Sequence, residues 1–191
     1  MDDIKLTNKV VWITGAGRGI GRTLSLGFAQ RGAIVIATDF INEDAGLESL
    51  LQEFNEQSLF LQQDVRKNED AVRIATLIEA RFGSLDVLIN NAGIDPRQSL
   101  EEITNEDWAN VINTNLNGAW GTCKSALSLL KKSEASSIIQ VGSIIPHANF
   151  NKLTHYMSSK MALEGMTRGL ARDLGPFGIR VNCLVMGAVK V

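Results

Sequence analysis

The sequence has little cysteine, and what it has is widely spaced. The 191 residues include two cysteines, Cys123 and Cys183, which lie 60 positions apart with no CxxC spacing. A disulfide framework needs more cysteine than this, and a cysteine-based zinc site needs closer spacing. We therefore expect no structural disulfide and no metal, and a reducing cytoplasm as the location.

Long apolar runs and an excess of either charge are also absent. No apolar stretch approaches the roughly 20 residues that span a bilayer, and the start, MDDIKLTNKV, lacks the pattern of a signal peptide. The formal net charge is −2, which gives no basic surface for nucleic acid. These absences favour a small-molecule partner and argue against nucleic-acid or membrane partners.

What the sequence does contain is a regular alternation of short β-branched runs with longer stretches of helical periodicity. Strands are predicted at 10–14, 33–38, 58–63, 85–90, 136–142 and 179–185, and helices within 19–32, 68–83, 104–130 and 154–175. The strand runs are too continuously apolar to face water, so helices should cover both faces of a parallel sheet. This predicts one doubly wound α/β domain over residues 1–191. Thr104, with Asp107 three positions on, is its clearest helix N-cap.

A glycine-rich segment, TGAGRGIG, follows the first predicted strand and opens the first predicted helix. Gly15, Gly17 and Gly21 permit a tight turn, a close backbone approach and a helix start whose free N–H groups favour pyrophosphate. In this context the segment predicts a Rossmann-type dinucleotide site, with an ordinary tight turn as the alternative. The other residues assigned to the cofactor here are Arg18, Gly19 and Ile20.

The end of the second predicted strand bears on the choice of cofactor. Asp39 lies 18 residues after Gly21, where a carboxylate can accept hydrogen bonds from the hydroxyls of the adenosine ribose. It would repel the 2′-phosphate of NADP, whereas Arg18 would either pair with that phosphate or neutralise Asp39. We expect NAD as the preferred cofactor and NADP as the second choice, with Phe40 beside Asp39 in the same site.

Tyr156 and Lys160 are four positions apart in HYMSSKMALEG, and so lie one above the other on a helix. A free phenol has a pKa of about 10 and is a poor base at neutral pH. An ammonium group on the same face would stabilise the phenolate and lower this pKa, so that Tyr156 exchanges a proton with an alcohol or a carbonyl. A surface accident is the alternative interpretation.

The two histidines are not predicted to be catalysts. His155 is adjacent to Tyr156, but neighbouring helical residues point about 100° apart, so His155 is expected to face a loop or solvent. His147, with Ile94, Ile145 and Asn149, is expected in loops at the nicotinamide end of the site, where it would shape the substrate pocket.

TGAGRGIG, NNAG at 90–93, Asn115, Ser143 and the Tyr156/Lys160 pair occur in an order and spacing that resembles the short-chain dehydrogenase/reductase family, from about residue 8 to the end of the chain. The resemblance implies an oxidoreductase that transfers a hydride between NAD(H) and an alcohol or ketone. It implies that Ser143 orients the substrate oxygen, that Asn115 holds a proton-relaying water, and that Lys160 also binds the nicotinamide ribose. The implied catalytic set is Asn115, Ser143, Tyr156 and Lys160.

The resemblance also extends the cofactor site and implies an oligomer. Asp64 and Val65 correspond to residues that hold the adenine, and a turn that lines the cofactor corresponds to Asn91, Ala92 and Gly93. Without the resemblance, Asp64 could equally be a turn residue at the end of a strand. Asn90 and Asn91 could equally form an ordinary turn. A homodimer or homotetramer through the helices at about 105–130 and 153–174 is expected by family analogy.

The last stretch, VNCLVMGAVKV, departs from the family pattern. Met186 stands in the place of a proline and Val191 in that of a threonine, which leaves Gly187 and Val189 as backbone contacts to the nicotinamide. A seventh strand and the substrate-covering helices are expected to be missing, with the sixth strand left as an apolar edge. Two further hypotheses follow: a truncated, non-catalytic relative that binds dinucleotide or a partner subunit, and a fragment of a longer gene product.

Overall fold

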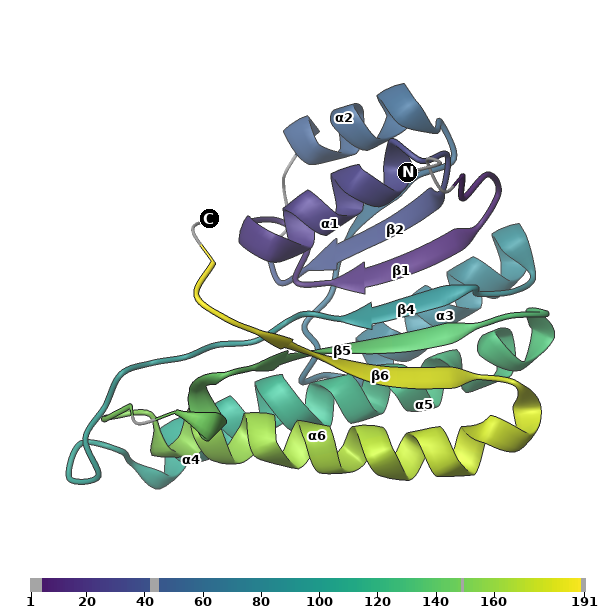
Figure 1. Ribbon diagram of the computed structural model, residues 1–191. Helices are drawn as coiled ribbons and strands as arrows, with labels where there is room; N and C mark the ends of the chain where they lie inside the picture. Colours follow the sequence, from purple (N-terminus) through teal and green to yellow (C-terminus); the bar gives the residue numbers. More distant parts are fainter. Residues whose placement is uncertain (1–4, 42–44, 149, 190–191) are drawn as a thin grey trace.

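A single parallel sheet organises the computed structural model, which describes residues 5–41, 45–148 and 150–189 (Figure 1). The six strands of the described residues run in the order β3-β2-β1-β4-β5-β6, and every neighbouring pair is parallel. They are β1 (Val10–Thr14), β2 (Ile34–Asp39), β3 (Leu59–Gln62), β4 (Val87–Asn90), β5 (Ser137–Ser143) and β6 (Arg180–Met186). The chain reverses its direction across the sheet between β1 and β4, which confirms the predicted doubly wound fold.

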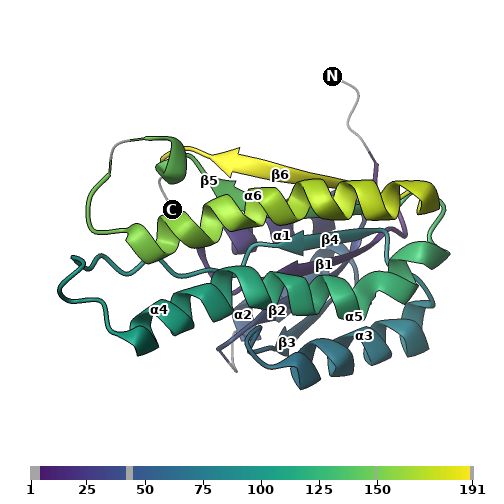
Figure 2. The ribbon, with the colours of Figure 1, turned by 90° about the horizontal axis from the view of Figure 1, so that it is seen from below.

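Helices cover both faces of the sheet, as predicted. In Figure 1, α1 and α2 lie above β1, β2 and β3, whereas α5 and α6 lie below the sheet and α3 lies behind it. Figure 2 shows α3, α5 and α6 from their side of the sheet. The helices are α1 (Gly19–Ala29), α2 (Ala45–Phe54), α3 (Asn68–Phe82), α4 (Asn105–Ile112), α5 (Gly118–Lys132) and α6 (Thr154–Leu174). Short 3-10 turns, η2 (Ile145–His147) and η3 (Gly175–Phe177), follow β5 and α6.

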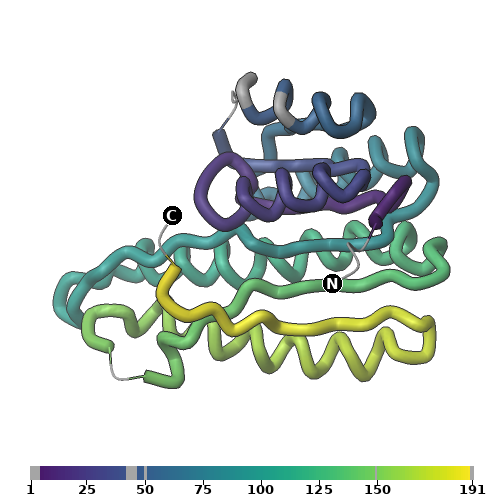
Figure 3. Tube along the Cα trace, turned by 45° about the horizontal axis from the view of Figure 1, so that its top comes forward, coloured from purple at the N-terminus to yellow at the C-terminus, as the bar shows by residue number. Residues whose placement is uncertain are grey.

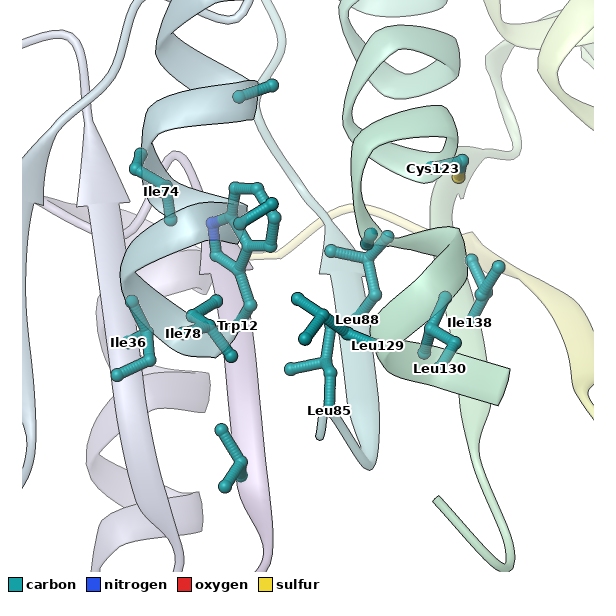
Figure 4. Close-up of a cluster of buried hydrophobic side chains, with 14 of the residues drawn as sticks. Trp12, Ile36, Ile74, Ile78, Leu85, Leu88, Cys123, Leu129, Leu130 and Ile138 are labelled. Atoms are coloured by element: carbon teal, nitrogen blue, oxygen red, sulfur yellow. The ribbon is translucent and has the colours of Figure 1, made fainter. Parts of the chain in front are cut away.

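The core consists of two apolar clusters, one on each face of the sheet. Because side chains alternate along a strand, Trp12 of β1 points into the cluster under α3 and α5, where Ile74, Leu88 and Leu129 surround it (Figure 4). Val11 and Ile13 of the same strand point into the other cluster, under α1 and α2. Both faces of β1 are therefore buried, which explains why its sequence is apolar throughout.

The outer strand β6 has a different environment. Among the described strands it pairs only with β5, and Figure 3 shows it as the outermost strand on that side of the sheet. Leu184 and Val185 are 47% and 41% exposed. These two side chains form the apolar edge that was expected at the sixth strand.

The helix predicted over 104–130 is not continuous. A π-helical segment, η1 (Asn113–Asn117), separates α4 from α5, so the prediction of one regular helix is wrong here. The predicted start is confirmed, since the Thr104 hydroxyl accepts the Asp107 N–H and the Asp107 carboxylate accepts the Thr104 N–H, both at 3.0 Å. π-Helical turns are rare and often occur at functional sites, and the fully buried side chain in this one belongs to Asn115.

Candidate active site

A cleft of about 1040 Å³ opens at the carboxyl ends of the strands, where the strand order reverses. This is the position at which open α/β sheets bind their ligands. Most of the residues predicted from the sequence line it, whereas Gly17, Gly21 and Asn115 are buried and are not among its lining residues. The predicted residues in the lining are Gly15, Arg18, Gly19, Ile20, Asp39, Phe40, Asp64, Val65, Asn91, Ala92, Gly93, Ser143, Tyr156, Lys160, Gly187 and Val189.

The loop between β1 and α1 has room only for glycine at its critical positions. A Cβ atom on Gly21 would lie 2.1 Å from the Gly15 carbonyl oxygen, and Gly15 itself has a φ of +65°. The first turn of α1 has no side-chain cap, so its free N–H groups remain available beside Gly19 and Ile20 in the lining. Free donors at a helix start, backed by the helix dipole, form a cradle for an anionic phosphate.

Asp39 is tied to this glycine loop. Its Oδ2 atom accepts the Gly17 N–H at 2.8 Å, which fixes the carboxylate at the rim of the cleft. Arg18 also lines the cleft, but the described residues show no salt bridge between it and Asp39.

The turn after β4 locks onto the same loop. The Asn91 side-chain amide donates to the carbonyl oxygens of Thr14 and Gly15, at 3.1 and 2.8 Å, and the Thr14 hydroxyl accepts the N–H groups of Asn91 and Ala92 at 3.1 Å each. Asn91 is thus more than an ordinary turn residue, because its side chain joins two loops that lie 76 positions apart.

Asp64, which lines the cleft just after β3, is held by a neighbouring arginine. Arg66 donates from Nε to Oδ1 at 2.9 Å and from Nη2 to Oδ2 at 2.8 Å, and its backbone N–H donates to Oδ1 at 3.0 Å. This fork of hydrogen bonds keeps the pKa of Asp64 below its usual value. The Arg66 guanidinium also lies 5.5 Å from the centre of the Phe40 ring, so these side chains form one wall of the cleft.

Tyr156 and Lys160 face the cleft from the same side of α6. The Lys160 Nζ atom lies 5.8 Å from the centre of the Tyr156 ring and donates to the Val141 carbonyl oxygen at 2.8 Å. Ser143, at the end of β5, lines the cleft beside Tyr156 and lowers the pKa of its phenol. The phenol, the amine and the hydroxyl thus meet in the same cleft as the glycine loop.

Burial decides the pKa values of this group. Desolvation raises the pKa of Tyr156, the Ser143 hydrogen bond opposes this effect, and the charge of Asp95 adds to it. Among the protein's own groups the loss of water has the largest effect on this pKa, and its direction is opposite to the lowering that was expected with the dinucleotide bound. Burial likewise lowers the pKa of Lys160, which is only 5% exposed, from 10.5 to about 8.

Asn115 connects the site to a neighbouring loop. Its Oδ1 atom accepts the Ile94 N–H at 2.8 Å, and its Nδ2 atom donates to the Ile94 carbonyl at 2.9 Å and to the Ser159 hydroxyl at 3.0 Å. The widened π-helical turn presents this side chain toward the loop after β4. Asn115 thereby fixes Ile94, which lines the cleft.

The sequence can now be set beside known proteins. A family model described as short chain dehydrogenase matches residues 9–191, nearly the whole chain. The chain belongs to the short-chain dehydrogenase family. It is 40% identical over 186 residues to the D-xylose 1-dehydrogenase of Caulobacter vibrioides, covering 97% of this chain and 73% of that relative.

Two more members of the short-chain dehydrogenase family show a similar extent of matching. The trans-4-hydroxycyclohexanecarboxylate dehydrogenase of Sinomonas cyclohexanicum is 35% identical over an alignment of 193 positions. The alignment covers 97% of this chain and 74% of that relative. The crystal structure of carveol dehydrogenase from Mycobacterium avium in complex with NAD superposes with a TM-score of 0.86 at 28% identity, covering 95% of this chain and 71% of that one. The chain is therefore shorter than these relatives.

The turn after β6 is where the chain departs from the family pattern. Met186, Gly187 and Val189 all line the cleft, so the turn reaches the site despite the missing proline. Val191 lies outside the described residues.

Of the two histidines, His155 faces the loop after β4, as expected, through its contact with Gln98, and it is 0% exposed. The expectation for His147 is not met. His147 bonds to Glu164 of α6 at 2.6 Å and does not line the cleft, and neither does Ile145. Asn149 lies outside the described residues.

Some residues of the cleft escaped the prediction. Asp95, Thr114 and Arg66 all contribute to its lining. Asp95 follows Gly93 by two positions and Arg66 follows Asp64 by two, so the rule that loops after parallel strands meet at one edge would have found both. Thr114 lies in the π-helical segment, which the sequence pattern did not reveal.

Two further classes of function find no support in the described residues. The part of the chain that the structure describes contains no cluster of three histidine, cysteine or acidic side chains suited to a metal ion. Within the same residues, each helix is either too short or too polar to cross a membrane.

Proposed function

We propose that the protein is an NAD-preferring oxidoreductase that transfers a hydride between NAD(H) and an alcohol or ketone, with Tyr156 as the general acid and base. The observation that carries the proposal is the meeting of Tyr156, Lys160 and Ser143 in one cleft with the glycine loop. Membership of a family whose named relatives are dehydrogenases supports the same reaction class.

The cleft fits a dinucleotide along its length. The uncapped start of α1 and the crowded Gly21 position suit a pyrophosphate, and Asp39 at the rim suits two ribose hydroxyls. Asp64 and Val65, with Asn91, Ala92 and Gly93, would line the remainder of the cofactor, and Gly187 and Val189 would contact the nicotinamide. When bound, the dinucleotide supplies the hydride acceptor or donor.

The proton chemistry belongs to the protein's own side chains. Because burial raises the pKa of Tyr156, its phenol is protonated at neutral pH and ready to donate to a carbonyl oxygen. In the oxidation direction the phenolate needs positive charge nearby, which Lys160 and the oxidised nicotinamide ring provide. Ser143 would hold the substrate oxygen beside the phenol, while Asn115 would hold a water that relays protons from Lys160.

Asp39, at the rim of the cleft, supports NAD over NADP. Its carboxylate would accept hydrogen bonds from the ribose hydroxyls and would repel a 2′-phosphate, and the described residues show no salt bridge between it and Arg18. The solved relative in complex with NAD is consistent with this preference.

The test is Tyr156→Phe, assayed with NAD and NADP against a panel of alcohols and ketones. Loss of the phenol should reduce turnover by about 10²- to 10⁴-fold, the range that a general acid or base contributes. Dinucleotide affinity, followed by fluorescence titration, should change little. Arg172→Lys, an exposed position near the end of the same helix, is the control and should keep wild-type turnover. Full turnover in the phenylalanine variant would refute the proposal.

The non-catalytic alternative is not favoured, because nothing in the arrangement separates the reacting side chains from the cofactor cleft. It would gain support if the wild-type protein bound NAD but converted no member of the panel.

We also propose that α5 and α6 carry a contact with a second copy of the chain. Trp120 and Met161 are 50% and 45% exposed on these helices. A Cβ atom built on Gly165 or Gly169 would meet nothing within 4 Å, so these small residues do not pack against the protein's own sheet. Their exposure leaves room for the close approach of another helix. Light scattering that finds only monomer at micromolar concentration would contradict this proposal.

A further inference from the structure

The proton chemistry leaves one fully buried titratable side chain without a role. His155 is 0% exposed and belongs to the first turn of α6, directly before Tyr156. Its Nδ1 atom lies 2.9 Å from the backbone nitrogen of Tyr156, and its Nε2 atom lies 3.1 Å from the Gln98 Oε1 atom. The imidazole of His155 therefore contacts both the backbone of the proposed acid and base and the side chain of Gln98.

The tautomer of this imidazole follows from its partners. A backbone N–H can only donate, so Nδ1 must accept, and in a neutral ring Nε2 then carries the hydrogen and donates to Gln98. Burial lowers the pKa of His155, and the charge of Asp107 opposes this effect. The neutral ring therefore makes both contacts at once.

The contact with Tyr156 meets a need at the start of the helix. The first N–H groups of an α-helix lack partners within the helix, and Leu153, at the N-cap position of α6, provides no side-chain cap. His155 supplies an acceptor from within the first turn. The ring thereby fixes the backbone on which the phenol is mounted.

The contact with Gln98 joins α6 to the loop between β4 and α4. Gln98 lies in the loop of residues 91–103 between β4 and α4, and its backbone N–H donates to the Lys152 carbonyl oxygen at 2.9 Å. Asn115 anchors this loop at Ile94, and the segment between the two anchors includes Asp95, which lines the cleft. Gln98 is thus the second of two fixed points on one wall of the site.

We infer that His155 is a positioning residue that clamps the 94–103 segment of this loop to the turn of α6 that carries Tyr156. The inference rests on the proposed function, because it takes Tyr156 as the reacting group. The clamp sets the distance between the wall of the cleft and the phenol. Errors of about 1 Å in such distances cost up to about 100-fold in rate.

The two contacts of the ring can be removed separately. In His155→Asn, the side-chain oxygen replaces Nδ1 and keeps the acceptor for Tyr156, but nothing reaches Gln98. In His155→Gln, the amide nitrogen replaces Nε2 and keeps the donor to Gln98, but the acceptor is lost. Gln98→Ala removes the second contact from the opposite side. His147→Asn is the matched control, since this other histidine is exposed and bonds to Glu164 outside the cleft.

The experiment measures kcat, KM and NAD affinity for these variants, with hydrogen exchange across residues 94–103. His155→Asn should keep kcat within about twofold and raise KM about three- to tenfold, the effect of one buried hydrogen bond. His155→Gln should instead lower kcat by a similar factor. His155→Asn combined with Gln98→Ala should be no worse than the poorer single variant, because both remove the same contact. NAD affinity should stay unchanged throughout.

Additive effects of the two substitutions, or wild-type kcat, KM and loop protection in both histidine variants, would show that His155 only fills space and would overturn the inference. Wild-type protein that turns over no substrate would refute the proposed function instead. The clamp would then be judged by hydrogen exchange alone, where residues 94–103 should exchange faster in His155→Asn than in His147→Asn. Equal exchange in the two variants would also overturn it.

Discussion

The two halves of the sheet build their parts of the cleft by different means. At the glycine loop after β1, backbone atoms set the geometry: glycines approach each other closely and the Gly17 N–H holds Asp39 of β2. On the side of β4, β5 and β6, buried polar side chains set it, through the contacts of Asn115, Lys160 and His155.

The difference suggests how each half tolerates change. A position defined by backbone crowding fails when any atom is added, whatever its chemistry. A position defined by a side-chain hydrogen bond fails when one functional group is removed, even if the shape is kept. Substitutions that add a methyl group on one side and remove a polar atom on the other therefore test the comparison.

The largest effect is expected from Gly21→Ala. The added Cβ atom would lie 2.1 Å from the Gly15 carbonyl oxygen and 2.6 Å from the Asn91 amide, so the loop must move. We expect a loss of more than about 3 kcal/mol of unfolding free energy, beyond ordinary overpacking, together with loss of NAD binding.

Gly169→Ala is the matched control for this change, because its Cβ atom would meet nothing within 4 Å on the exposed face of α6. It should stabilise the monomer fold slightly, by up to about 1 kcal/mol. Urea unfolding of both variants checks the pair, and equal stability of the two would mean that crowding does not define the loop.

The next effect concerns Lys160, whose burial is costly at neutral pH. Its pKa falls from 10.5 to about 8 in the folded protein, so the unfolded chain holds this proton more tightly. Lys160→Met removes the cost and should raise the unfolding free energy at pH 7 by up to about 3 kcal/mol, less the lost bond to Val141. Turnover should nevertheless collapse.

The difference in unfolding free energy between the wild type and Lys160→Met should depend on pH. Between pH 8 and 10.5 the unfolded state binds more protons than the native state, so the stability of the wild type should rise with pH relative to the variant. The gap between the two should therefore close across that window. Unfolding measured at several pH values checks it, and a gap independent of pH would mean that Lys160 is not desolvated.

The smallest of the three effects is expected at Asp39. Asp39→Ala removes the proposed acceptor for the ribose hydroxyls and the charge that would repel a 2′-phosphate. The ratio of kcat/KM with NAD to that with NADP should fall by about tenfold or more, the value of hydrogen bonds to a charged group. Since Asp39 also accepts the Gly17 N–H, thermal unfolding serves as the control for loop damage. An unchanged ratio would make the NAD assignment wrong.

The fold was largely predictable because its strands are apolar on both faces. The predicted strand ranges agree with the structure to within two residues at each end, since long buried runs between glycine-rich turns leave few alternatives. The π-helical segment was not predictable, because its widened turn depends on Asn115 bonding to Ile94, 21 positions earlier in the chain.

The site was predictable where a motif is contiguous and unpredictable where burial decides. The glycine loop and the Tyr156/Lys160 spacing can be read from neighbouring letters, and these residues do share one cleft. The direction of the Tyr156 pKa depends on how much water the fold removes. His155 likewise contacts Gln98, which lies 57 positions away in the sequence. Neither the pKa direction of Tyr156 nor this contact of His155 can be predicted from neighbouring residues in the sequence.

The π-helical segment fixes the length of the helical stretch in which it lies. Each residue inserted or deleted rotates everything beyond it by about 100°. A deletion within Asn113–Asn117 would therefore either swing Asn115 off Ile94 or turn Cys123 and Leu130 of α5 out of the core that they share with α3. This stretch can exchange side chains but not change in length, so insertions and deletions should be tolerated only in the loops on either side of it.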